Sequence, residues 1–89
     1  MATITPTALT ATELADRLAE QIAPLRDLFH SGNANTATGS RVVHDSVKGL
    51  IKALRAGEID PVVAQVRLIA INKRATFYNV RRITAGEIH

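Results

Sequence analysis

The sequence predicts a small all-α protein, a bundle of three helices that becomes four if the first helix breaks at Pro24. Two observations carry this prediction. Apolar residues recur at helical spacing in three separate runs, and helix start and stop signals bracket those runs. The length of 89 residues fits one domain and not two. We therefore expect a flexible Thr-rich tail over residues 1–9 and a single helical domain over 10–89.

The first helix is expected over residues 10–30. Thr10 is its N-cap and Glu13, three residues on, completes a capping box. Pro24 lies inside the pattern, where it removes one backbone hydrogen bond and crowds the carbonyl of Glu20. A kink or a break into two shorter helices is expected there. The apolar positions of this helix are Leu14, Leu18, Ile22, Leu25, Leu28 and Phe29.

The second helix is expected over residues 40–56. Residues 31–40 are small and polar without an apolar period, which predicts a flexible loop. Ser40 can then cap the helix, and Gly57 is a C-terminal signal. Its apolar face consists of Val43, Val47, Leu50, Ile51 and Leu54.

The third helix is expected over residues 60–85, because Asp60 and Pro61 form a strong start signal and no breaker follows before Gly86. The short connection over 57–59 predicts a hairpin of the second and third helices. A continuous third helix would be ~38 Å long and the second only ~24 Å. The overhang would carry Phe77, Val80 and Ile83.

These three overhanging side chains need cover, either from the first helix or from another copy of the chain. We therefore expect a homo-oligomer with contacts at Phe77, Val80 and Ile83. The alternative is a break near residues 72–76, where helix propensity is weaker. The sequence leaves both open.

Composition excludes several classes of protein. The chain has no cysteine, so no disulfide staples it, which suits a reducing compartment. Residues 1–9 lack the charged and apolar regions of a signal peptide. The most apolar window, residues 62–71, is interrupted by Gln65 and Arg67 and is far shorter than a membrane span of ~20 residues. We expect a cytoplasmic protein that does not enter a membrane.

Charge is distributed unevenly along the chain. Residues 1–40 hold two Lys/Arg against four Asp/Glu, whereas residues 41–89 hold nine against four. A basic part of this kind indicates an anionic partner. It equally fits attraction between the two parts, within one fold or between copies.

Two basic stripes are the candidate partner-binding or phosphate-binding residues. On the second helix, spacing of three or four residues aligns the basic side chains, with His44 among them. On the third, arginines recur every seven residues. The full set is Arg41, Lys48, Lys52, Arg55, Arg67, Arg74, Tyr78 and Arg81. Adjacent basic helices can track a phosphate backbone, and Tyr78 can stack on an unpaired base. The alternative is a solvated helix face paired with the acidic first helix.

Other motifs are weak. Ala53 and Gly57 have the spacing of a helix-turn-helix, but Glu58 and Asp60 would repel phosphates at the start of a recognition helix. Close packing of a hairpin explains the same spacing.

No catalytic or metal-binding arrangement stands out. The triplet at residues 44–46 has the residue types of a catalytic triad. Neighbours on one helix point ~100° apart, so we expect no chain of hydrogen bonds among them. No histidine accompanies the acidic residues of the first helix, so they do not mark a metal site. We expect no enzyme activity, no cofactor and no metal.

The sequence thus predicts a non-enzymatic helical protein, a regulatory or assembly subunit, that binds a macromolecular partner. The alternative is a DNA- or RNA-binding protein that contacts phosphates through the two basic stripes. The alternative requires both stripes on one continuous surface that the first helix leaves uncovered.

Overall fold

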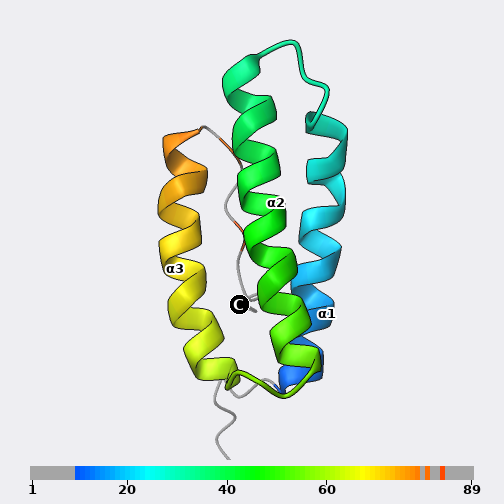
Figure 1. Ribbon diagram of the computed structural model, residues 1–89, viewed down its shortest axis with the longest axis vertical. Helices are drawn as coiled ribbons and strands as arrows, with labels where there is room; N and C mark the ends of the chain where they lie inside the picture. Colours follow the sequence, from blue (N-terminus) through cyan, green and yellow to red (C-terminus); the bar gives the residue numbers. More distant parts are fainter. Residues whose placement is uncertain (1–9, 79, 81–82, 84–89) are drawn as a thin grey trace, which may run out of the picture.

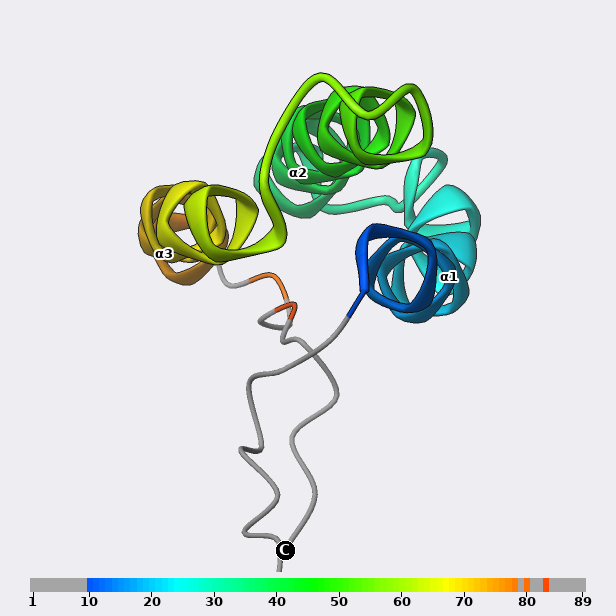
Figure 2. The ribbon, with the colours of Figure 1, turned by 90° about the horizontal axis from the view of Figure 1, so that it is seen from below.

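The computed structural model describes residues 10–78, 80 and 83. Within this part the chain forms three α-helices, α1 (Ala11–Ile22), α2 (Ala34–Arg55) and α3 (Pro61–Phe77), and a 3₁₀ helix, η1 (Ala23–Leu28). Figure 1 shows α2 between the other two helices, and the end-on view of Figure 2 shows α1 and α3 on either side of it. The predicted all-α bundle with a hairpin of the last two helices is confirmed. A fourth α-helix is not present among the described residues.

The start of α1 is the predicted capping box. The Glu13 backbone N–H donates to Thr10 Oγ1 at 3.1 Å, and the Thr10 N–H donates to Glu13 Oε1 at 3.0 Å. The α-helix ends at Ile22, and η1 follows with Pro24 in its first turn. Pro24 therefore ends the regular helix, as its missing N–H requires. The first helix is shorter than the predicted range of 10–30, although Leu25 in η1 is still buried.

The start of α2 lies six residues earlier than predicted, at Ala34 instead of Ser40. Asn33 is the N-cap, and its side-chain oxygen accepts from the Thr36 N–H at 3.0 Å. The prediction of a flexible loop over 31–40 was wrong for residues 34–40, which form the first turns of this helix. Ser40 is buried within it and donates its hydroxyl to the Ala37 carbonyl at 3.0 Å.

The first turns of α2 also pack against the end of α3. A Cβ atom placed on Gly39 would collide with Tyr78 Cβ, so α2 and the residue after α3 are in close contact there. Only glycine permits this approach. Tertiary contact thus overrides the weak helix propensity of residues 34–40.

The hairpin between α2 and α3 is made by a Schellman motif. Gly57 adopts a left-handed backbone with φ of 71°. The Glu58 N–H donates to the Ala53 carbonyl at 2.9 Å, and the Gly57 N–H donates to the Leu54 carbonyl at 3.1 Å. Asp60 then caps α3 by accepting from the Val62 N–H at 2.8 Å. The predicted helix stop at Gly57 and the predicted helix start at Asp60 are both confirmed.

The end of α3 differs from the prediction. The helix stops at Phe77, not near residue 85, and the chain turns back against the bundle. Val80 and Ile83 are 5% and 2% exposed and belong to the same core as the helices. In Figure 2 their segment, coloured orange, lies between α3 and α1. The predicted overhang is absent for these two residues, so their assignment as oligomer contacts was wrong.

A buried asparagine holds this returning segment. The side-chain amide of Asn72 donates to the Ile83 carbonyl at 2.5 Å, and its oxygen accepts from the Ile83 N–H at 2.7 Å. The amide therefore pairs with both the backbone N–H and the carbonyl of one residue, as an antiparallel β-strand partner does. Asn72 is only 8% exposed, and Ile83 is buried as well. Leaving the N–H and the carbonyl of Ile83 without a hydrogen bond would therefore lower the stability of the fold. This pair anchors the returning segment at Ile83.

The core is almost entirely aliphatic. It consists of Leu14, Ala15, Leu18, Ile22, Leu25, Val43, Val47, Leu50, Ile51, Leu54, Ala64, Leu68, Ala75, Val80 and Ile83. None of the helices described here has the length and apolar character needed to cross a membrane.

Candidate interaction surface

Apolar side chains lie on two opposite sides of α3. One side faces the bundle and buries Ala64, Leu68 and Ala75 together with Asn72. At ~100° per residue, a second row at residues 62, 66, 69, 73 and 77 lies on the opposite side. We call this row the outer face of α3; it consists of Val62, Val66, Ile69, Lys73 and Phe77. An α-helix of a small bundle usually carries polar residues there.

The outer face is well exposed to solvent. Its four apolar members, Val62, Val66, Ile69 and Phe77, are 63%, 61%, 60% and 77% exposed. Together they expose an apolar area on the order of 400–500 Å², comparable with the largest patch of a typical monomer. Lys73 is the charged residue of the row. Patches of this kind mark sites of protein association more often than single exposed apolar residues do.

A shallow groove of about 380 Å³ runs between α2 and α3 beside the outer face. Its α2 wall is made of small residues around Leu50, and Arg67 and Arg74 line it from α3. The full lining is Ser46, Gly49, Leu50, Ala53, Arg67, Ala70, Ile71 and Arg74. An added Cβ on Gly49 would meet no atom within 4 Å, so this wall is open at its middle.

The basic stripe of α2 lies on another side of that helix. Arg55 Nη2 is 3.1 Å from Asp16 Oδ1 of α1, and the Arg41 guanidinium lies 4.8 Å from the Phe29 ring centroid. Both contacts point toward α1 and η1. The groove residues of α2, in contrast, face α3.

Among the predicted binding residues, Arg41 and Arg55 make contacts on the α1 side of α2, whereas Arg67 and Arg74 line the groove with α3. Lys48 and Lys52 are exposed on α2, between Arg41 and Arg55 in the sequence. Tyr78 is half-buried against Gly39, and Arg81 lies outside the described residues.

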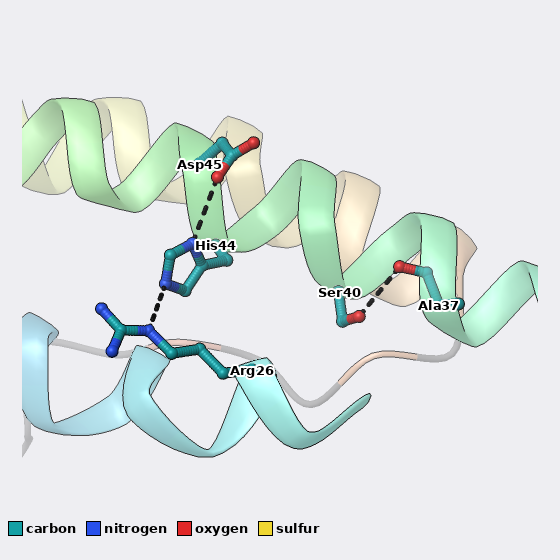
Figure 3. A network of polar contacts seen from close by, with 5 residues as sticks. All are labelled: Arg26, Ala37, Ser40, His44 and Asp45. Atoms are coloured by element: carbon teal, nitrogen blue, oxygen red, sulfur yellow. Dashed lines mark hydrogen bonds and ion pairs between the residues drawn. The ribbon is translucent and has the colours of Figure 1, made fainter. Parts of the chain in front are cut away.

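His44 is buried in a polar contact of its own (Figure 3). Arg26 Nε donates to His44 Nε2 at 3.3 Å, and His44 Nδ1 lies 3.2 Å from Asp45 Oδ1. Because the arginine is always a donor, Nε2 is the acceptor and Nδ1 carries the proton that is donated to Asp45. The Phe29 ring packs edge-on at 5.2 Å.

This contact bears on the triad residue types at positions 44–46. His44 and Asp45 do reach each other, although they are neighbours on one helix. The nitrogen that a triad would aim at a nucleophile is occupied by Arg26, and Ser46 lines the groove with α3. The polar groups of His44 thus join η1 to α2. Within the described residues, no three potential ligands among His, Cys, Asp and Glu gather to hold a metal ion.

Sequence reasoning missed most of the outer face of α3. Phe77 was recognised as unpaired, but Val62, Val66 and Ile69 were not predicted to share an exposed face. Their spacing of four and three residues was the available signal, because it places them on one side of a helix. The buried residues of the same window lie on the other side.

Comparison of the chain with protein-family models, with curated proteins and with solved structures gives no match. The function is therefore inferred from the chain's own residues.

Proposed function

We propose that this protein is a non-enzymatic helical interaction module that binds a protein partner through the outer face of α3. One observation carries the proposal: Val62, Val66, Ile69 and Phe77 form an apolar row that is more than half exposed, opposite the buried side of the same helix. Helix-in-groove and helix-on-helix recognition both use anchors at this spacing.

The size of the outer face sets the strength of binding. At ~25 cal/mol per Å², burying on the order of 400–500 Å² stabilises a complex by roughly 10 kcal/mol before association costs. Those costs are ~4–15 kcal/mol. We therefore expect reversible binding, which is typical of a regulatory or assembly subunit.

Nucleic-acid binding is the second hypothesis, and the positions of the basic residues favour it less. A phosphate-tracking surface needs its cations side by side. Here Arg67 and Arg74 of α3 line the groove with α2, whereas Arg41 and Arg55 of α2 make their contacts on the α1 side. Arg55 is moreover paired with Asp16.

Site-specific photo-crosslinking tests the two hypotheses together. A photoreactive phenylalanine analogue replaces Ile69 on the outer face or, as the matched control, Lys52 on the basic stripe. Both residues are exposed, so neither replacement should disturb folding. In the cells that produce the protein, we expect polypeptide adducts from position 69 and few from position 52. Adducts that form only at position 52, or that a nuclease removes, would overturn the proposal.

A further inference from the structure

We infer that the partner of the outer face is a second copy of this chain, bound as an antiparallel α3–α3 pair whose twofold axis passes beside Ile69 and Ala70. This inference deepens the proposed function and rests on it. Figure 2 shows α3 at one edge of the bundle, with the side away from α2 clear of the other described helices. A second α3 can therefore approach without moving α1 or α2.

The order of side chains on the outer face is self-complementary in that register. A twofold axis between residues 69 and 70 places Val62 of one copy opposite Phe77 of the other. Phe77 is the most exposed apolar side chain of the face. The axis also places Ile69 opposite Ala70, an exposed small residue next to the row. Large side chains thus meet smaller ones across the interface, as close packing of two helices requires.

The single cation of the row has a place in the same arrangement. Lys73 of one copy lies opposite Val66 of the other. Its aliphatic stem can cover the valine while the ammonium group remains in water at the edge of the interface. An isologous pair repeats this contact on both sides of the axis.

Charge favours the antiparallel direction. Glu58 and Asp60 lie at the N-terminal end of α3, and Lys73 and Arg74 lie near its C-terminal end. Antiparallel pairing places the acidic end of one helix at the same end of the pair as the basic end of the other, so the long-range interaction between them is attractive. Parallel pairing would place like charges side by side and align the helix dipoles unfavourably.

The area predicts a weak dimer. Two copies of the outer face with a polar rim bury on the order of 1,000 Å², near the lower end of specific interfaces. The equilibrium should therefore depend on protein concentration in the micromolar range, with monomer at high dilution.

Cysteine cross-linking tests the register, because the natural chain contains no cysteine. In the full chain, Ala70→Cys and Ile69→Cys place the two thiols beside the axis, and we expect both to form disulfide-linked dimers on mild oxidation. Val62→Cys places them at opposite ends of the interface and should remain monomeric, as should Lys52→Cys on α2. Linking of Val62→Cys as efficiently as Ala70→Cys would overturn the antiparallel register.

Sedimentation equilibrium tests the association itself. Ile69→Glu should weaken dimerisation at least tenfold, and Lys73→Leu should strengthen it about tenfold, since each changes an exposed residue of the face. Circular dichroism confirms that both variants remain helical. A wild-type chain that is monomeric throughout, or whose association ignores Ile69→Glu, overturns the inference. If Ile69 then still cross-links to another polypeptide, the proposed function stands alone; if it does not, both fail.

Discussion

The α1–α2 pair and α3 bury their apolar residues in different ways. In α1, the buried residues Leu14, Leu18 and Ile22 share one side, and the other side is polar. In α3, small residues such as Ala64 and Ala75 face the bundle, and larger ones such as Ile69 and Phe77 face solvent. The first pair is complete within one chain. The outer side of α3 has the composition of an interior, and the proposed contact with a second copy of the chain would bury it.

Truncating matched side chains in the two regions is the strongest test of this contrast. Leu18→Ala, at a position that is 0% exposed, should lower the free energy of unfolding by about 2–5 kcal/mol. Val66→Ala on the outer face should change it by no more than ~0.5 kcal/mol in dilute solution. Urea denaturation followed by circular dichroism measures both. Ile22→Val provides a milder core variant that keeps the protein folded, with an expected loss of ~0.5–1.5 kcal/mol. Equal losses for Val66→Ala and the core variants would mean that the outer face is packed within the monomer.

The two glycines of α2 sharpen the comparison, since they are chemically identical and differ only in what faces them. Gly39→Ala would force a Cβ against Tyr78 and should destabilise the fold by about 1–3 kcal/mol. Gly49→Ala points into open space and should stabilise it by about 0.4–1 kcal/mol. Thermal unfolding of the two variants should shift in opposite directions. A stabilising Gly39→Ala would disprove the close contact between α2 and Tyr78.

Asn72 links α3 to the returning segment, and its replacement should loosen that link selectively. Asn72→Ala leaves the Ile83 N–H and carbonyl without their partner, a loss of about 1–3 kcal/mol. Asn35→Ala, at an exposed asparagine of α2, is the matched control and should have little effect. Hydrogen exchange at the Ile83 amide should accelerate in the first variant alone. Unchanged protection there would show that the side chain does not anchor the segment.

The smallest expected effect is the pH response of the α1 start. The hydrogen bond from the Thr10 backbone N–H, and then that from its hydroxyl, lower the pKa of Glu13 below its ordinary value of 4.5. Because the folded-state pKa is lowered, the contribution of this carboxylate is complete above pH 4.5 and is lost as the pH falls through the folded value. An NMR titration should give a midpoint below 4.5 for Glu13, with fraying of the first turn on the acid side. Thr10→Ala removes the hydroxyl but keeps the backbone N–H, so it should move the midpoint only part of the way back toward 4.5. An unchanged midpoint in this variant would contradict the contribution assigned to the hydroxyl.

Local signals predicted the parts of the fold that depend on neighbouring residues. The caps at Thr10 and Asp60 and the stop at Gly57 form hydrogen bonds within a few residues, so the sequence pattern contains them. The early start of α2 has a local signal that was missed, the cap at Asn33, whereas the contact of Gly39 with Tyr78 joins residues that are distant in sequence. Periodicity within one segment cannot reveal such a contact.

The same distinction applies to the end of α3 and to the candidate site. Asn72 appeared as a residue of weak helix propensity, and its pairing with Ile83 required knowledge of where the chain returns. Phe77 was predicted as a contact residue and is the most exposed member of the outer face. The basic residues were recognised by spacing along each helix, but the angle between helices decides which of them share a surface.

The contact of Tyr78 with Gly39 also gives the protein a spectroscopic label of its own. The chain contains one tyrosine and no tryptophan, so its near-ultraviolet fluorescence comes from a single ring. That ring lies where α2 meets the end of α3, and its centroid is 5.2 Å from that of Phe77 on the outer face. Emission and anisotropy of the unmodified protein therefore report on closure of the bundle and, through Phe77, on occupancy of the outer face.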